Sequence, residues 1–324
     1  MDRPSRTQNP LSRVSDFGFV PLAVCGLAAM FVFDDYTLYR LTLAGVLAIA
    51  VLGLSLLTGL SGQFSIGHSA FFAAGAYATA VGMNQFGLNA YVTIPLAALV
   101  AFVIGAAFGW PASRLSAVHL VLVTWGMAVS MPRLLKSTVM EPWTGGVQGI
   151  YIERPLPPSS LPLSEDQWWH LVVLAILVLA LWIGRNLCRG RSARALTALK
   201  DHEIAAASMG VPVALYKTMI FGISASFAGV AGSLTGLLTD FVAPDSYGVF
   251  FSILLLIGAV AGGLGSIWGA LFGGLLIQYL PDLAANASAA LSFPAYGLIL
   301  LALVYVFPAG VAGTVNRWTA RRRR

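Results

Sequence analysis

One uncharged stretch of the chain runs from Ser246 to Pro281, 36 residues without an acidic, basic or histidine side chain. As one straight helix it would be about 54 Å long, whereas the hydrocarbon core of a bilayer is about 30 Å thick. The stretch therefore has to turn back, either as a helical hairpin or as a span followed by a re-entrant segment. The glycine-rich residues 262–265 are the expected bend.

Apolar segments of spanning length recur along nearly all of the 324 residues, of which 58% are hydrophobic and 10% are charged. Soluble chains carry about 25% charged residues, so this composition excludes an ordinary soluble domain. The expected fold class is an all-α, polytopic transmembrane bundle of about ten spans with a short cytoplasmic coupling helix. The expected spans are 17–33, 38–60, 66–86, 91–110, 117–131, 168–184, 218–239, 248–264, 266–280 and 293–311.

Positive charge gives the expected orientation. Ten spans with a cytoplasmic N-terminus place 15 of the 19 lysines and arginines inside, in agreement with the positive-inside rule. Treating the stretch from Ser246 to Pro281 as a single span would put the arginine-rich C-terminus outside, so the even count is favoured. The four basic residues that remain outside are Arg40, Arg133, Lys136 and Arg154.

This orientation divides the chain into three parts. A cytoplasmic tail at 1–16 precedes a transmembrane domain at 17–311, and a basic cytoplasmic tail follows at 312–324. Within the domain, the outer loop 132–167 is rich in proline and is expected to be ordered but non-helical. The second long loop, 185–217, is cytoplasmic. The C-terminal arginines are expected to meet anionic lipid headgroups.

Several residue types exclude other classes of protein. Cys25 lies in an apolar span and Cys188 beside a cytoplasmic loop, so no disulfide is expected. Metal-ligand spacing, phosphate-cradling loops and interleaved basic and aromatic residues are all lacking, so neither a metal nor nucleic acid is expected. The adjacent His68 and Ser69 lack a carboxylate to orient them, which argues against catalysis. Trp168 is expected at the membrane–water interface together with its neighbour Trp169.

The basic loop 185–217 fits two short helices. Ser192 is the expected N-cap of the first helix and Asp201 that of the second, with Glu203 in the first turn, where a carboxylate opposes the helix dipole. Gly210 and the proline two residues later are expected to end the second helix. Because a helix of about two turns is marginal alone in water, we expect it to dock against another protein.

Polar side chains at membrane depth give candidate translocation residues. Gln63, Ser65 and His68 cluster at the start of the third span, and Thr124 lies in the shortest span, a feature typical of transport sites. The functional interpretation is a polar lining or gate of the solute path. The alternative is hydrogen bonding between helices, and for Thr124 a misplaced helix end; the sequence leaves these open.

Small residues give the candidate packing sites. Spacing of the type small-x-x-x-small lets helices approach closely in lipid. The residues with this role are Gly258, Gly262, Gly265, Gly269 and Gly273. A short echo between 62–67 and 263–268 is compatible with two related halves, although glycine-rich spans also resemble one another by composition alone.

Three separated motifs resemble one known family. The stretch GLSGQFSIGHSAFFAAGAY at 59–77 resembles the signature of permease subunits from branched-chain amino-acid ABC importers, and it is most similar to the M-type of their two permeases. Residues 194–217 resemble the coupling segment of this family, and residues 244–246 and 262–269 resemble its late-span pattern. The resemblance covers roughly residues 40–310, with the three motifs in the family's order.

The resemblance implies a non-catalytic subunit of the bacterial inner membrane. Its implied partners are a second related permease, two cytoplasmic ATPase subunits and an external solute-binding protein. ATP and Mg would be used by the ATPases, and this chain would bind no cofactor. The residues implied for ATPase coupling are Asp201, Glu203, Ala205, Ala206, Met209 and Gly210.

The implied solute is a branched-chain or related amino acid. Urea, amides and aromatic acids are the alternatives within the family. A stand-alone secondary transporter is the alternative from another class, but it requires ionisable groups at mid-depth that the sequence lacks; a structural scaffold ranks last. The sequence departs from the family pattern in three places. Near Thr124, His119 and Ser130 replace the family's usual tyrosine and glutamate, and Gln148 stands where an acidic residue is common. Glu203 lies one position early relative to the general coupling motif.

Overall fold

The computed structural model describes residues 19–158, 162–287, 305 and 310–314. Their secondary structure is almost entirely helical. In chain order the elements are α1 (Phe19–Val32), α2 (Asp35–Ser61), α3 (His68–Phe86), α4 (Ala90–Ala112), α5 (Ala117–Leu135), α6 (Glu141–Thr144), η3 (Gly146–Gln148), β1 (Ile150–Tyr151), α7 (Glu165–Arg189), α8 (Arg191–Asp201), α9 (Glu203–Ser208), α10 (Val213–Thr239), β2 (Phe241–Val242), η4 (Pro244–Tyr247), α11 (Val249–Gly262) and α12 (Ile267–Ala287).

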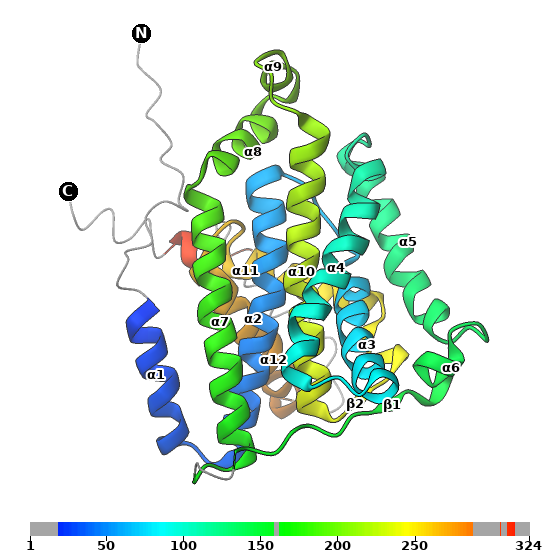
Figure 1. The fold of residues 1–324 in the computed structure, drawn as a ribbon. Helices are drawn as coiled ribbons and strands as arrows, with labels where there is room; N and C mark the ends of the chain where they lie inside the picture. Colours follow the sequence, from blue (N-terminus) through cyan, green and yellow to red (C-terminus); the bar gives the residue numbers. More distant parts are fainter. Residues whose placement is uncertain (1–18, 159–161, 288–304, 306–309, 315–324) are drawn as a thin grey trace, which may run out of the picture.

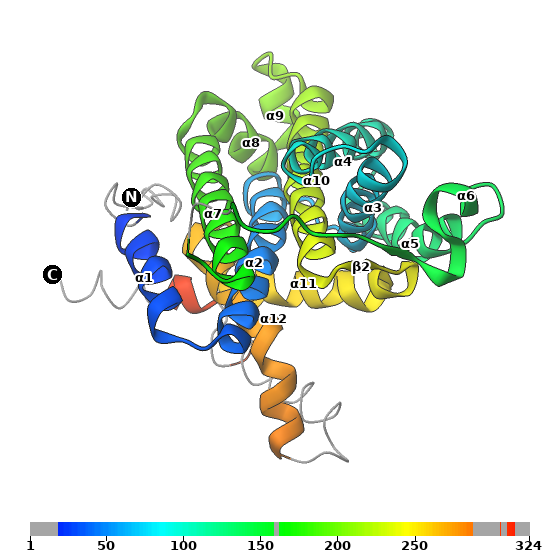
Figure 2. The same ribbon diagram turned by 60° about the horizontal axis from the view of Figure 1, so that its bottom comes forward.

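Helices α2 and α10 form the centre of the bundle (Figure 1). Their most apolar segments are 83% and 78% buried, compared with 22% for α5. Helices α3 and α4 pack along α10, whereas α7 and α12 pack along α2. Helix α5 lies at the edge, against α3, α11 and η4, and leaves most of its surface uncovered (Figures 1 and 2).

The all-α membrane fold expected from the sequence is confirmed. Helices α2, α4, α5, α7 and α10 are long and apolar enough to cross a membrane, and each of the first nine expected spans coincides with a helix. The tenth expected span, 293–311, lies mostly outside the described residues, as do most of the two tails. The count of about ten spans therefore stays a prediction.

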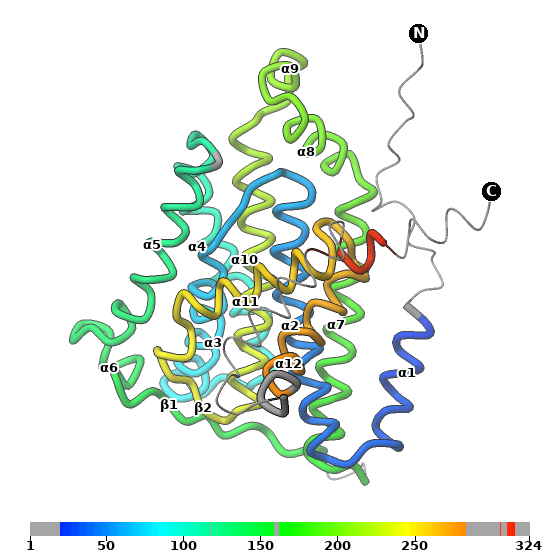
Figure 3. The backbone as a smooth tube through the Cα atoms, turned by 180° about the vertical axis from the view of Figure 1, so that it is seen from behind, coloured from blue at the N-terminus to red at the C-terminus, as the bar shows by residue number. Residues whose placement is uncertain are grey.

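The expected bend at 262–265 is also confirmed. Helix α11 ends at Gly262 and α12 begins at Ile267, and between them Gly263 and Gly265 have φ angles of 113° and 76°, which favour glycine. Helix α11 has 14 residues and is about 21 Å long, which is shorter than the hydrocarbon core. It runs obliquely across the rear of the bundle before the chain reverses into α12 (Figure 3).

The outer loop is more structured than its prolines predicted. It contains α6 and η3, so the expectation of a non-helical loop was wrong, and Ile150 of β1 pairs with Val242 of β2 in an antiparallel ladder. Both long loops are also shorter than expected, because α5 continues to Leu135, α7 runs from Glu165 to Arg189, and α10 begins at Val213.

The start of α7 explains one of these shifts. Ser164 and Gln167 form a reciprocal capping box, which satisfies backbone N–H groups at the first turn. Trp168, which is partly buried, donates its indole N–H to the hydroxyl of Tyr91. Trp169 is fully buried and donates to the carbonyl of Pro155; it therefore packs inside the bundle and is not an interfacial anchor.

Candidate coupling surface and translocation site

Helices α8 and α9 project from one end of the bundle (Figure 1), which we call the basic end because 185–217 carries six lysines and arginines. The expected caps of both helices were wrong. Gly190 is the N-cap of α8 and Ser192 lies inside it, while Asp201 is its last residue. His202 is the N-cap of α9, and at neither helix does the N-cap side chain accept a capping hydrogen bond. The first helix runs further than expected, so a single residue links the pair.

Helix α9 presents an apolar surface at this end. Ile204 and Met209 are each 87% exposed, and Ala205 is exposed beside them, whereas Ala206 is buried against the rest of the chain. Gly210 has a φ angle of +83°, as expected for a glycine that ends a helix. In a membrane protein this end faces water, so two large apolar side chains exposed there are typical of an interface with a partner.

Two lysines attach this pair of helices to the bundle. The Lys200 ammonium donates to the carbonyl of Gly59 at 2.9 Å, near the end of α2. Lys217 on α10 pairs with Glu203 on α9, with 2.6 Å between Nζ and Oε2. Glu203 is therefore already bonded within the chain. These two contacts connect α9 to α10 and α8 to the end of α2.

The candidate translocation residues meet at the connection between α2 and α3. Residues 62–67 form a non-helical connection, and burial alternates along them, with Gln63 and Ser65 buried. The backbone N–H of Ile66 donates to the hydroxyl of Thr124 at 3.1 Å. His68 follows as the first residue of α3 and is 1% exposed. The structure thus brings all four predicted residues together, on the inner side of this segment.

A continuous chain of hydrogen bonds satisfies His68. Its Nε2 lies 2.7 Å from the hydroxyl of Ser224 on α10, and that hydroxyl donates to the carbonyl of Gly53 on α2. Ser224 must therefore accept from Nε2–H, so that Nδ1 accepts from Ser65 at 3.1 Å. Ser65 accepts in turn from the N–H of Gly67. These groups hold helices together, as the alternative interpretation of this cluster predicted.

A second polar contact joins α3 to the hairpin of α11 and α12. Ser252 on α11 accepts from the N–H of Ser69 at 2.8 Å, and the two hydroxyls lie 2.7 Å apart. The sequence analysis did not identify Ser224 or Ser252 as functional. The sequence did carry one signal for them: each is a serine within an apolar helix, and a hydroxyl at membrane depth needs a hydrogen-bond partner.

The candidate packing glycines lie at close backbone contacts. A Cβ on Gly262 would overlap the carbonyl of Gly269, and one on Gly273 would overlap the carbonyl of Gly258. Gly265 packs against Gly59 of α2, where a Cβ would likewise overlap the backbone.

These contacts also connect the two sequence echoes. The N–H of Gly265 donates to the hydroxyl of Ser55 at 2.9 Å. Segment 62–67 connects α2 to α3, and segment 263–268 includes the connection between α11 and α12. Gly265 packs the second segment against the last turns of α2, just before the first segment begins.

Helix α5 carries the least covered polar surface of the described spans. His119 and Ser130 are exposed, and a Cβ on Gly126 would meet nothing within 4 Å. At 3.6 residues per turn these three positions lie along one side of the helix. Thr124 faces the opposite way, toward the connecting segment 62–67. Polar side chains facing lipid are unfavourable, so this side of α5 is the candidate lining of a path.

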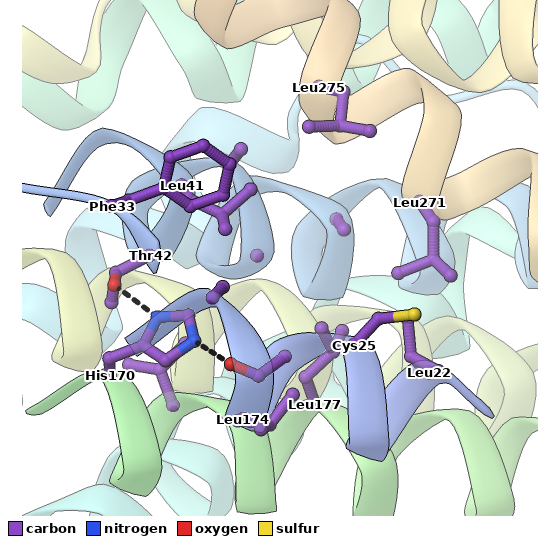
Figure 4. Close-up of a pocket in the computed structure, with 16 residues that line it drawn as sticks. Leu22, Cys25, Phe33, Leu41, Thr42, His170, Leu174, Leu177, Leu271 and Leu275 are labelled. Carbon is purple, nitrogen blue, oxygen red and sulfur yellow. Dashed lines mark hydrogen bonds between the residues drawn. The ribbon is translucent and has the colours of Figure 1, made fainter. Parts of the chain in front are cut away.

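A cavity of about 380 Å³ lies between α1, α2, α7 and α12 (Figure 4). Its walls are almost wholly aliphatic. The polar exceptions are His170 and Thr42, which lie 2.7 Å apart, and Nε2 of His170 also bonds the carbonyl of Gly26. Because both ring nitrogens are occupied, the cavity offers poor complementarity to a charged amino acid.

At the end opposite α9, Arg154 joins three carboxylates. Its guanidinium lies 3.1 Å from Glu165, 3.3 Å from Asp166 and 3.6 Å from Asp240. These contacts tie the outer loop to the start of α7 and the end of α10. Asp240 has a φ angle of +55°, and its Oδ1 is buried without a hydrogen-bond partner in the described structure. Burial raises the pKa of the Asp240 carboxyl, and Arg154 opposes that rise.

The fold and the apolar helices define a polytopic, helical, membrane-embedded protein. The family described as "Branched-chain amino acid transport system / permease component" matches residues 36–308. The chain belongs to this family.

Curated relatives agree with this assignment. The high-affinity branched-chain amino acid transport system permease protein LivM of Escherichia coli K12 is 30% identical over 310 residues, which cover 88% of this chain and 72% of LivM. Its counterpart LivH is 25% identical over 84% of this chain and 92% of its own length, and BraD of Pseudomonas aeruginosa is 24% identical over 84% and 93%. No solved structure matches the chain.

Proposed function

We propose that this chain is one of two related permease subunits of an ATP-driven importer. The observation that carries the proposal is the exposed apolar surface of α9, formed by Ile204 and Met209 at the basic end. The importer contains two cytoplasmic ATPase subunits, which use ATP and Mg, and this surface of α9 docks to an ATPase subunit. This chain itself is non-catalytic and binds no cofactor. Closure of the ATPases on ATP displaces α9, and the ties at Glu203 and Lys200 pass the motion to α10 and α2.

The orientation follows from charge. The basic end is cytoplasmic, with both termini on the same side of the bacterial inner membrane. The opposite end, with the cluster around Arg154 and the paired strands β1 and β2, faces the external solute-binding protein. Of the acidic residues in the described chain, only Asp201 and Glu203 belong to the basic end.

The second permease covers the exposed side of α5. A spanning helix that is so little buried within its own chain, with His119 and Ser130 exposed, gains protein neighbours in a two-permease assembly. The solute path runs along this side of α5. The buried group of Gln63, Ser65, His68 and Thr124 supports the path from behind by holding the connecting segment 62–67 in place. That both LivM and LivH resemble the chain supports a pair of related permeases.

The solute is a branched-chain or related amino acid. This assignment rests on the names of the relatives, and another small polar solute such as urea, an amide or an aromatic acid is the alternative. Competition among these solutes for uptake of labelled leucine by the assembled transporter distinguishes them.

Site-directed crosslinking tests the coupling surface. Met209→Cys, in membranes that contain the assembled transporter, is expected to crosslink to an ATPase subunit, with a yield that changes when ATP is bound. Tyr151→Cys is the matched control, because Tyr151 is 77% exposed at the other end and is expected to give no such product. A Met209→Cys protein that supports uptake but never crosslinks to an ATPase would contradict the proposal.

A further inference from the structure

The cavity of about 380 Å³ beside α1 results from the way α1 meets the bundle (Figure 4). Helix α1 packs mainly on α7, where a Cβ on Gly26 would overlap the side chain of Leu174. Near its end, Ala29 and Met30 also pack with Leu38 of α2. Along the rest of its length the cavity separates α1 from α2 and α12, so α1 lacks contacts there that the other helices of the bundle have.

This cavity lies at membrane depth. Along α7 its lining runs from His170 to Leu177, which is about 8 to 18 Å from the start of the helix. The first turn of α7 carries Glu165 and Asp166, and such charged side chains belong at the membrane surface. Because half of the hydrocarbon core is about 15 Å thick, the cavity lies within the leaflet at the end of the bundle opposite α9.

The mouth of the cavity lies between α1 and α12. Cys25 of α1, Phe33 just after α1 and Leu275 of α12 all belong to the lining, and all three are exposed among the described residues. Helices α1 and α5 lie at opposite edges of the bundle (Figure 1), and α5 is the helix proposed to meet the second permease. The mouth therefore opens toward the surrounding lipid.

The lining favours hydrocarbon over water or a charged group. The described residues that form it include no lysine, arginine, aspartate or glutamate. His170 bonds both the hydroxyl of Thr42 and the carbonyl of Gly26, so a water molecule would lack the two to four polar partners that it needs. Apolar cavities of about 150 Å³ in soluble proteins stay dry and bind small hydrocarbons such as benzene. This cavity is larger and adjoins the hydrocarbon of a bilayer.

We propose that the cavity binds one acyl chain of a phospholipid from the surrounding bilayer, irrespective of its headgroup. The chain enters between Cys25 and Leu275 and lies against Leu177 of α7 and Ala48 of α2, while the headgroup stays at the membrane surface. Lipid tails are as apolar as the lining, so the gain comes from dispersion contacts that an empty cavity would lack. The bound chain supplies the contacts that α1 lacks with α2 and α12, and it thereby holds α1 against the bundle.

Photolabelling of the full-length chain in phosphatidylcholine vesicles tests this inference. A small share of the lipid carries a diazirine midway along one acyl chain, and mass spectrometry locates the labelled residues. Val173 and Leu177 line the cavity and are buried, whereas Leu99 is exposed on α4 and lies at a similar depth, about 14 Å from the start of its helix. The ratio of cavity label to Leu99 label separates entry into the cavity from general contact with lipid. We expect label at Val173 or Leu177, with the same ratio when phosphatidylglycerol carries the diazirine.

Two tryptophan variants test whether the label depends on the space in the cavity. Cys25→Trp is expected to lower the ratio about tenfold, the effect of losing about 60 Å³ of filled cavity. Val24→Trp is the matched control, because Val24 is exposed on α1 and does not line the cavity, and it is expected to keep the wild-type ratio. Leu275→Trp obstructs the mouth from α12 and is expected to lower the ratio as well, so the test does not depend on one substitution in α1.

The inference is overturned if Val173 and Leu177 stay unlabelled in the wild type, as expected if another part of the chain fills the cavity. It is also overturned if Cys25→Trp and Leu275→Trp both keep the wild-type ratio, or if only one of the two lipids labels the cavity. None of these outcomes depends on whether α9 binds an ATPase.

Discussion

Lys217 Nζ lies 2.6 Å from Glu203 Oε2, and this ion pair joins the short helix α9 to the first turns of the central helix α10. Lys217 is 12% exposed and Glu203 is 51% exposed, so the lysine is fixed in the bundle and the glutamate approaches it from the water side. Glu203 is therefore bonded within the chain, whereas the apolar side chains of Ile204 and Met209 on α9 stay exposed.

Reversal of this ion pair tests the connection between α9 and α10. Glu203→Lys or Lys217→Glu alone places like charges together and is expected to reduce ATP-driven uptake by up to about fivefold, since an ion pair of this kind contributes about 0.2–1 kcal/mol. The double reversal is expected to recover part of the loss, because lysine in the first turn of α9 opposes the helix dipole. Transport assays in vesicles measure the uptake of each variant. Normal uptake by both single variants would contradict a functional connection between α9 and α10 through this ion pair.

The glycine contacts of the hairpin predict a steric effect. Gly262→Ala places a methyl group into the carbonyl of Gly269, and overpacking of this kind costs about 1–3 kcal/mol. We expect a lower melting temperature in detergent. Gly126→Ala on α5 is the control, since its Cβ meets nothing within 4 Å. Equal melting temperatures for the two variants would show that α11 and α12 do not approach as closely as described.

The chain of hydrogen bonds through His68 predicts a structural role for Ser224. Ser224→Ala leaves Nε2 of His68 and the carbonyl of Gly53 without this partner, and an unsatisfied buried group costs about 1–3 kcal/mol. Stability is expected to fall while the KM for solute stays constant. Ser130→Cys on α5 is expected to do the opposite, with normal stability and uptake that a thiol reagent blocks. A changed KM in Ser224→Ala would place Ser224 on the path.

The raised pKa of Asp240 predicts a pH-dependent stability. Because the folded state favours the protonated carboxyl, its contribution is full below the ordinary pKa of 3.8 and is lost as pH rises through the folded-state pKa. Asp240→Asn removes the charge, and asparagine tolerates the φ angle of +55°. At neutral pH the variant is expected to be more stable than the wild type, whereas in acid the two are expected to be equally stable. Thermal unfolding measures this, and a destabilised variant at neutral pH would contradict it.

The sequence predicted the helical bundle well because the signal for a membrane span is spread over about 20 residues. Apolar runs and charge bias do not depend on a particular contact, so nine expected spans coincide with helices. The bend at Gly262–Gly265 was predictable for a similar reason, since a helix nearly twice as long as the hydrocarbon core is thick has to reverse, and glycine is the residue that permits the turn.

The helix ends were harder, because caps are local and degenerate. Ser192 and Asp201 are both good capping residues, yet α8 begins before one and ends at the other. The capping box of Ser164 and Gln167 was visible in the sequence as S-x-x-Q and would have placed the start of α7 correctly. Trp169 was misplaced because burial by the outer loop depends on contacts that no local pattern records.

The partners of the polar residues could not be predicted at all. His68 and Ser224 are 156 positions apart in the chain, and only the packing of α3 against α10 brings them together. The same holds for Lys200, whose bond to Gly59 joins a surface helix to the end of a buried one.

The most direct test of the account is ATP-driven uptake by an Ile204→Asp, Met209→Asp variant in reconstituted vesicles with its ATPase. Both side chains are exposed, so the variant is expected to insert and melt like the wild type. The account predicts that it neither retains the ATPase nor transports solute. A stable variant that binds the ATPase and transports solute at the wild-type rate would contradict it.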